Sequence, residues 1–456
     1  MNRQFDAIIV GAGQAGPSLA GRLTEAGQSV ALIERKWFGG TCVNTGCMPT
    51  KTLVASARAA HMARRAADFG VMLEGNVGID MARIKARADT VIANARQGVR
   101  AWLEGMDGCT VIEGHARFED THRLRVGDDQ LEAPRIFLDV GGRASVPDMP
   151  GLHDVPWLTN STMLELDHVP SHLLIIGGSY IGLEYAQMYR RFGARVTVVE
   201  KGPRLIGRED EDVSAAVSDI LEGEGISIRT GVTDIAFGRD QESITATLDG
   251  DALACSHVLV AVGRTPNTDD LDLDKAGVAM DARGYITVDD ELCTNVPGIW
   301  ALGDCNGRGA FTHTAYNDFE IIAANLLDGE SRRLSERVSG YALYIDPPLG
   351  RVGLTEAAAR KRDRPYLVGK RPMTRVGRAV EKDETQGFMK VVIDAESRKI
   401  LGAAILGTGG DEAIHGIIDM MSVDATATQL QRAVPIHPTV SELIPTLLAS
   451  VREPDD

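Results

Sequence analysis

Two cysteines stand close together near the amino terminus, in the segment GGTCVNTGCMPTK at residues 39–51. Cys42 and Cys47 are separated by four residues, and Pro49 with the apolar run after it predicts that a helix begins at Cys47. Backbone N–H groups and the helix dipole stabilise a thiolate there, so the pKa of Cys47 should fall. A disulfide across so short a loop adds little entropic stability and is comparatively easy to reduce. The pair therefore predicts a redox-active disulfide.

Buried free thiols and metal ligands are the alternative interpretations of this pair. No further Cys or His lies nearby at ligand spacing, so we expect no resident metal. The other four cysteines are too scattered for the disulfide scaffold of a small secreted protein: Cys109, Cys255, Cys293 and Cys305.

A glycine-rich turn between two apolar runs precedes the cysteines and must help to position them. The segment DAIIVGAGQAGPSLAGRLTEAGQSVALIE places Gly11, Gly13 and Gly16 in the turn and Glu34 at the end of the second run. In such a βαβ unit the glycines let the backbone approach a pyrophosphate at a helix amino terminus, and the carboxylate binds ribose hydroxyls.

A second copy of the same pattern follows in HLLIIGGSYIGLEYAQMYRRFGARVTVVE, with Gly177, Gly178 and Gly182 in the turn and Glu200 at the end. The last glycine and the acidic residue are 18 positions apart in both copies, so a chance match is much less plausible than for a single turn. Two dinucleotide sites predict a bound flavin and an exchangeable nicotinamide, and therefore hydride transfer.

Length and composition limit the remaining possibilities. A chain of 456 residues and 48.9 kDa suggests about three domains. The net charge of −16 opposes nucleic-acid binding, because phosphates are held mainly by Lys and Arg. No apolar stretch approaches the roughly 20 residues of a membrane span, and no secretory signal precedes the first strand. We expect a cytoplasmic protein that binds neither nucleic acid nor membrane.

In combination, these segments resemble the class I pyridine nucleotide-disulfide oxidoreductases, the flavoprotein family of dihydrolipoamide dehydrogenase, glutathione reductase and mercuric reductase. Six motifs of the family appear in the same order as in its members: VGAGQAG, GGTCVNTGC, GGSYIGLE, AVGRTPN, TNVPGIWALGD and HPTVSE. The resemblance covers essentially the whole chain and implies an FAD-dependent homodimer.

The expected fold is α/β, with two Rossmann-like dinucleotide-binding domains, one for FAD and one for NAD(P), and a carboxyl-terminal α+β dimerisation domain. The first part of the FAD-binding domain is placed at residues 1–145, and the NAD(P)-binding domain at 146–266. The second, central part of the FAD-binding domain is placed at 267–338 and the dimerisation domain at 339–456. Residues 52–100 are expected to be helical.

The resemblance also assigns catalytic roles. Cys47 would be the sulfur next to the flavin that forms the charge-transfer thiolate, and Cys42 the interchange thiol that attacks the substrate. Lys51 and Glu184 would pair beside the flavin and the nicotinamide. Taken alone, both could be ordinary solvated helix charges.

His437 and Glu442, in HPTVSE, match the acid–base dyad of the family, in which the carboxylate orients an imidazole that moves a proton to and from the interchange thiol. In relatives this histidine comes from the opposite subunit. An isolated histidine in a loop would by itself be interpreted as structural.

Further residues would contact FAD. Asp304 would hold the ribitol chain, Glu34 would bind the adenosine ribose, and Lys51 would lie beside the flavin ring. Backbone groups near three other positions would complete the flavin site: His115, Gly141 and Ala315.

The second glycine-rich unit, with Gly263 of AVGRTPN, would bind the nicotinamide dinucleotide. NADPH-linked relatives carry arginines where this chain has Glu200 and Ile206. A carboxylate binds a free 2′-hydroxyl but repels a 2′-phosphate, so we favour NADH over NADPH, although three cations are close by: Lys201, Arg204 and Arg208. Two departures from the family pattern are Ser179, where a glycine is usual, and Val140, where a threonine is usual.

The acceptor is left open between several classes. The chain ends in SVREPDD rather than the cysteine pair of mercuric reductases, yet its cysteine segment is similar to theirs. Dihydrolipoamide dehydrogenase fits the dyad, and bacterial metal- or oxidant-response flavoproteins share the Pro-Thr-Lys after the second cysteine. We predict NAD(P)H-dependent reduction of a disulfide or of a thiophilic metal or oxidant. The alternatives are dihydrolipoamide dehydrogenase itself, a mercuric-reductase-like enzyme, a flavin-level quinone reductase or diaphorase and, least favoured, a redox-sensing protein without turnover.

Overall fold

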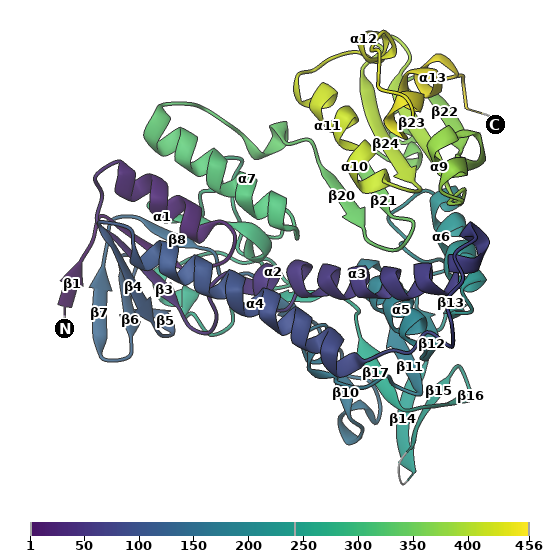
Figure 1. Ribbon diagram of the computed structural model, residues 1–456. Helices are drawn as coiled ribbons and strands as arrows, with labels where there is room; N and C mark the ends of the chain where they lie inside the picture. The colour runs from purple at the N-terminus through teal and green to yellow at the C-terminus, as the bar shows by residue number, and fades with distance from the viewer. Residues whose placement is uncertain (1, 241–242, 455–456) are drawn as a thin grey trace.

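The computed structural model describes residues 2–240 and 243–454. Figure 1 shows three bodies: an amino-terminal unit, a central unit and a carboxyl-terminal domain, in the colour order purple to blue, teal and yellow, with the helix α7 returning to the first body. Mixed helices and strands throughout confirm the predicted α/β class.

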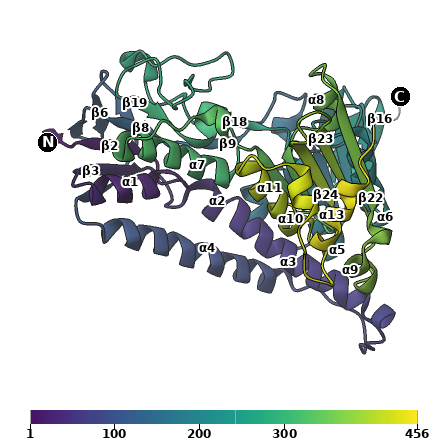
Figure 2. The same ribbon diagram turned by 90° about the horizontal axis from the view of Figure 1, so that it is seen from above.

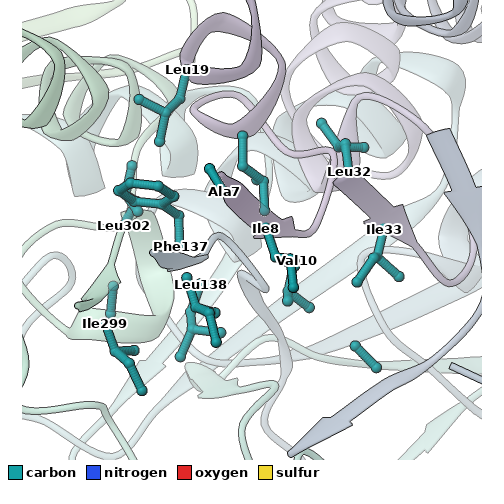
Figure 3. Packing of buried hydrophobic residues seen from close by; sticks show 14 of the residues in the cluster. Ala7, Ile8, Val10, Leu19, Leu32, Ile33, Phe137, Leu138, Ile299 and Leu302 are labelled. Carbon is teal, nitrogen blue, oxygen red and sulfur yellow. The ribbon is translucent and has the colours of Figure 1, made fainter. Parts of the chain in front are cut away.

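A parallel five-stranded sheet forms the core of the amino-terminal unit. Its two central strands are the apolar runs of the first glycine-rich segment, and continuous burial of such runs is typical of a sheet covered on both faces. Ile8, Leu32 and Phe137 are fully buried there, and Figure 3 shows their packing. The strands, in sheet order, are β19 (Ile299–Ala301), β8 (Ile136–Leu138), β2 (Ala7–Val10), β3 (Val30–Glu34) and β4 (Cys109–Glu113).

A smaller four-stranded sheet lies beside it and belongs to the same unit (Figure 1). Its strands, in sheet order, are β1 (Asn2–Gln4), β7 (Asp129–Glu132), β6 (Arg123–Val126) and β5 (Ala116–Phe118).

The helices of the amino-terminal unit carry the cysteines. The structure confirms that a helix begins at Cys47, but the long helical segment predicted at residues 52–100 is two helices interrupted at residues 65–80. Gly70 adopts φ +74° within this interruption, a conformation that ends a helix. Figure 2 shows the two helices running along one side of the molecule. The helices are α1 (Gly16–Glu25), α2 (Gly40–Asn44), α3 (Cys47–Arg64), α4 (Met81–Glu104) and α7 (Thr312–Ala323), and the one-turn helix η5 (Gly303–Asn306) precedes α7.

The central unit repeats the plan of the first, as the repeated sequence pattern predicts. Its parallel sheet has the order β10 (Trp157–Leu158), β17 (His257–Val260), β11 (His172–Ile176), β12 (Arg195–Glu200) and β13 (Ser227–Thr230). Its helices are α5 (Tyr180–Phe192) and α6 (Glu211–Gly223), and α5 packs against α3. An antiparallel sheet is added: β14 (Ile235–Asp240), β15 (Ser243–Leu248) and β16 (Asp251–Cys255).

The chain enters and leaves the central unit through two paired strands. β9 (Gly142–Ala144) and β18 (Arg264–Pro266) run antiparallel, with Arg264 opposite Ala144. The two connections between the units therefore lie side by side. The exact domain limits drawn from the sequence remain predictions.

An antiparallel five-stranded sheet forms the carboxyl-terminal domain. The buried Arg351 on this sheet pairs with Glu209 of the central unit at 3.2 Å, which joins the two bodies. The strands, in sheet order, are β20 (Gly340–Leu343), β21 (Leu349–Gly353), β24 (Ile400–Leu406), β23 (Phe388–Asp394) and β22 (Tyr366–Pro372). The helices are α8 (Glu356–Arg360), α9 (Gly377–Glu381), α10 (Gly410–Ala413), α11 (His415–Ser422), α12 (Ala427–Gln431) and α13 (Ile444–Ala449).

Among the helices of the described residues, none combines the length and apolar character that a bilayer crossing requires.

Candidate active site

The two cysteines of the predicted redox pair lie on neighbouring helices, Cys42 in α2 and Cys47 as the first residue of α3. Both are free thiols in this structure, and the Cys42 thiol donates a hydrogen bond to the Cys47 sulfur. This bond, helped by the Thr312 hydroxyl 3.4 Å from the sulfur and by the Lys51 ammonium, lowers the pKa of Cys47 to about 6. Cys47 is therefore a thiolate at neutral pH.

Cys42 has the opposite character. Its thiol donates to Cys47 and is also partly buried, and both effects raise the pKa of Cys42 above that of a free cysteine. A thiol attacks a disulfide only as the thiolate. Cys42 therefore needs a base before it can act as a nucleophile.

Thr312 has no counterpart in the sequence-based predictions. It is the first residue of α7, and 265 positions separate it from Cys47, so only the fold brings the hydroxyl to the sulfur. In the sequence, the position of Thr312 indicates a place near the flavin, because it lies shortly after the predicted flavin residue Asp304 and three residues before Ala315.

We expect Thr312→Val to raise the pKa of Cys47, because the variant removes a hydrogen bond to the thiolate. One such bond corresponds to about 1 kcal/mol, or about 0.7 pH units. The pH midpoint of the long-wavelength band of the two-electron-reduced protein measures this pKa. Thr312→Ser keeps the hydroxyl and should keep the wild-type midpoint, so equal shifts in both variants would contradict the assignment.

Lys51 and Glu184 form an ion pair, with the Lys51 Nζ 2.7 Å from the Glu184 Oε2. Glu184 is buried in α5, and its other oxygen accepts a 3.1 Å hydrogen bond from the backbone N–H of Tyr344. The Lys51 ammonium also lies 4.6 Å from the centroid of the Tyr344 ring. The interpretation of these residues as solvated helix charges is therefore wrong for Glu184, whose carboxylate is enclosed and paired next to the cysteines.

The first glycine-rich turn leaves no space for side chains. A Cβ atom at Gly11 would lie 2.2 Å from the Asp139 carbonyl oxygen, and one at Gly16 would lie 2.4 Å from the Gly11 carbonyl oxygen. Glu34 accepts a 2.9 Å hydrogen bond from the Ala12 N–H, so its carboxylate lies against this turn, as a ribose ligand must. At Gly13 a Cβ would lie 2.7 Å from a carboxylate oxygen of Asp139, a residue that sequence reasoning also missed.

The other predicted flavin residues lie in four segments of the amino-terminal unit. Asp304 pairs with Arg264 at 3.0 Å, and burial raises the pKa of Asp304. His115 Nε2 lies 2.9 Å from the Asp270 carbonyl oxygen, which holds the imidazole at the edge of the unit. Two positions offer backbone groups: Gly141 with φ +62° follows β8, and Ala315 is buried in α7.

The second glycine-rich turn has the same construction. A Cβ at Gly177 would lie 2.4 Å from the Ala261 carbonyl oxygen, and one at Gly182 would lie 2.1 Å from the Gly177 carbonyl oxygen. Glu200 accepts hydrogen bonds from the N–H groups of Gly178 at 2.7 Å and Gly202 at 2.6 Å. The last predicted residue, Gly263, has φ +141° and open space at its Cα, and Ser179 precedes α5 without a side-chain cap.

His437 and Glu442 form the predicted dyad, with the His437 Nδ1 2.9 Å from the Glu442 Oε2. The His437 side chain is 78% exposed, whereas that of Glu442 is 15% exposed. Among the described residues no hydrogen bond joins the dyad to either cysteine of the same chain. The imidazole is therefore oriented by Glu442 and exposed.

Comparison with family models places these features in a known context. Residues 5–318 match the family described as pyridine nucleotide-disulphide oxidoreductase, and residues 340–448 match the dimerisation domain of that family. The chain is a class I pyridine nucleotide-disulfide oxidoreductase. The resemblance drawn from the motifs is thereby confirmed, together with the fold class it implied.

Relatives of this oxidoreductase span its full length. The probable pyridine nucleotide-disulfide oxidoreductase RclA of Escherichia coli K12 is 34% identical over 99% of this chain and 100% of that protein. A mercuric reductase of Streptomyces lividans is 33% identical over 96% of this chain and 94% of its own, and a dihydrolipoyl dehydrogenase of Chlamydia muridarum is 31% identical over 97% and 96%. A solved structure described as the Cu(II) complex of the HOCl-induced flavoprotein disulfide reductase RclA matches with a TM-score of 0.90 at 32% identity, covering 98% of this chain and 99% of that one.

The residues of this oxidoreductase fit the FAD and pyridine nucleotide that the family uses. Both glycine-rich turns are cradles in which a side chain would collide with the backbone, and each has a carboxylate held against it. A dinucleotide pyrophosphate needs this close backbone approach at a helix amino terminus.

Proposed function

We propose that this enzyme passes reducing equivalents from NADH, through FAD and the Cys42–Cys47 disulfide, to a disulfide or thiophilic oxidant. One observation carries the proposal: the Cys47 thiolate, stabilised by Cys42 and Thr312, lies within the electrostatic reach of the Lys51–Glu184 pair. The enzyme class follows from the family, whereas the electron donor and the acceptor are our inference.

The turn around Gly11 and Gly16, with Glu34 and Asp304, would hold FAD, and Lys51 would lie beside its ring. When bound, FAD supplies the relay of an electron pair between the nicotinamide and the disulfide. The buried Glu184 would hold the Lys51 ammonium in a fixed direction.

Electrons and protons balance in the reaction of the two cysteines. Reduction of the Cys42–Cys47 disulfide consumes two electrons and one proton and leaves the Cys42 thiol and the Cys47 thiolate. Cys42 loses its proton to a base and attacks the acceptor disulfide, which forms a mixed disulfide and expels one thiolate that takes the proton. The Cys47 thiolate then attacks the Cys42 sulfur, re-forms the disulfide and expels the second product.

The base for Cys42 would be His437 of the partner subunit. On the single chain the imidazole is oriented by Glu442 but exposed, and the domain that carries it matches the dimerisation family. We propose that the enzyme is a homodimer and that Glu442 orients the imidazole and fixes its tautomer. We also propose that it acts in the cytoplasm.

NADH is the proposed donor because Glu200 closes the nucleotide turn with a carboxylate. We expect Glu200→Arg combined with Ile206→Arg to raise the ratio of kcat/KM for NADPH over NADH on the order of 100-fold, as one or two charge-assisted hydrogen bonds to a 2′-phosphate would. Steady-state kinetics with both nucleotides measure this. Glu211→Arg combined with Ala215→Arg, at two exposed positions of α6, makes the same charge change outside the turn and is the control. An unchanged ratio in the double variant would contradict the role of Glu200.

A second candidate is reduction of a thiophilic metal ion. Two observations favour it: the full-length match to a mercuric reductase and the match to a structure described as a Cu(II) complex. An acceptor panel of lipoamide, glutathione disulfide, Hg²⁺, Cu²⁺ and a quinone, each with NADH, separates the candidates. Cys42→Ser should keep quinone reduction, which needs only the flavin, and lose the acceptors that need the thiol pair. Loss of quinone reduction, or retention of disulfide reduction, would contradict the proposed thiol relay.

A further inference from the structure

A buried carboxyl group lies directly beneath the turn that binds the FAD diphosphate. Asp139 follows the last residue of β8 and is 6% exposed. Its Oδ2 accepts a 2.9 Å hydrogen bond from the N–H of Gly16, at the start of α1. The same oxygen would lie 2.7 Å from a Cβ at Gly13, so the carboxyl fills the inner side of the turn.

The surroundings of Asp139 do not neutralise it. The ionisable groups on the elements around it are acidic: Glu34 at the end of β3, Asp304 and the thiol of Cys305 in η5, and Asp318 in α7. Two cations of this region are engaged by other carboxylates, since Arg264 pairs with Asp304 and Arg337 pairs with Asp318. Burial raises the pKa of Asp139 to about 8, against the opposing effect of the Gly16 hydrogen bond.

A bound diphosphate would add negative charge on the other side of the same turn. The helix amino terminus offers only about half a positive charge, and an ionised Asp139 would compete with the phosphates for it. In so buried a place two like charges repel strongly, and protonation of the weaker acid relieves the repulsion.

We propose that Asp139 is a positioning residue for FAD that holds it only when its own carboxyl group is protonated. FAD binding then takes one proton from solvent onto Asp139 where the carboxyl was ionised, and FAD release returns it. The neutral carboxyl keeps the Gly16 N–H in place without opposing the phosphates. The enzyme accordingly loses flavin as the solution becomes alkaline.

The direction in which FAD affinity changes with pH follows from the linkage between FAD binding and proton binding. The state with FAD binds the proton more tightly than the state without it, so FAD affinity is constant below the lower pKa and falls as pH rises above it. With the flavin-free pKa of Asp139 at about 8, the loss begins near that pH and does not exceed about tenfold per pH unit.

The experiment is release of FAD from the purified holoenzyme. Samples are diluted into buffers from about pH 6.5 to about pH 9.5, and the rise in flavin fluorescence gives the extent and rate of release. Wild-type protein should release more FAD, and release it faster, above about pH 8. Asp139→Asn keeps an oxygen for the Gly16 N–H but carries no charge, so its release should vary little with pH. Glu25→Gln, at the opposite end of α1, makes the same charge change and should behave as wild type.

Release that rises with pH equally in Asp139→Asn and wild type would overturn the proposal. So would faster release from the asparagine variant than from wild type at about pH 9.5, where the wild-type carboxyl is ionised, because the ionised carboxylate would then hold FAD better than a neutral group in its place. A wild-type measurement is independent of how the variant folds. In weakly buffered solution near pH 8.5, release of each FAD should liberate up to about one proton, detected with an indicator dye, and no liberated proton would also overturn the proposal.

Discussion

Replacing Cys47 with serine is expected to abolish the long-wavelength absorption of the two-electron-reduced protein and to lower disulfide reduction at least about 1,000-fold. The first effect follows because Cys47 carries the thiolate, with its pKa lowered to about 6 by the Cys42 hydrogen bond. The second follows because loss of a covalent-catalysis nucleophile acts on this scale. Anaerobic titration with dithionite and steady-state assays measure the two effects.

Two other cysteine variants make this test specific. Cys42→Ser should still form a long-wavelength band, since Cys47 remains, while disulfide turnover is lost. Cys293→Ser removes a half-buried thiol of the isolated β-bridge to Trp300 and should leave both properties unchanged. A band that persists in Cys47→Ser would show that another group lies beside the flavin.

His437→Gln is expected to reduce disulfide turnover by a factor of about 100 to 10,000, the usual effect of removing a general acid–base group. The reason is the raised pKa of Cys42, which leaves this thiol protonated without a base. Reduction of a quinone by the flavin should continue. His168→Gln is a matched control, because His168 also contacts a carboxylate, that of Asp167 at 3.1 Å, on the surface of the central unit.

A mixed dimer tests whether the imidazole acts across subunits. One subunit carries Cys42→Ser and the other carries His437→Gln, so a site that combines the intact cysteines of one subunit with the intact histidine of the other exists once per dimer. Activity should return to about half of wild type, whereas each parent dimer is inactive. An inactive mixed dimer would place the base within the same chain as the thiol it serves.

Local sequence patterns were sufficient for the parts of the site that consist of contiguous segments. The helix start at Cys47 follows from Pro49 and the run after it, and the turns around Gly11 and Gly177 follow from glycine spacing, since each pattern is formed within one βαβ unit. The interruption at residues 65–80 was missed because helix-forming residues flank it, and α3 ends at Arg64 without a glycine at its carboxyl end.

Contacts between distant segments could not be predicted in this way. Thr312 reaches Cys47 across 265 positions and Asp139 reaches Gly16 across 123, and nothing in either local sequence marks the neighbour. The family pattern marks Val140, where a threonine is usual, but not Asp139 next to it. These two hydrogen bonds arise from tertiary packing, to which spacing rules do not apply, whereas the bond between Cys42 and Cys47 lies within one short segment.

Because β9 and β18 are adjacent, the central unit could be replaced by another nucleotide-binding unit at these two strands. Two cuts at neighbouring points would free it, and a foreign nucleotide-binding unit joined there would close its ends at little entropic cost. Such a graft would also have to reproduce contacts away from the joints, among them the pair between Lys51 and Glu184. It would have to supply the carboxylates of Glu209 and Asp210, because without both of them Arg351 would remain as a buried, unpaired charge, which costs about 3–5 kcal/mol.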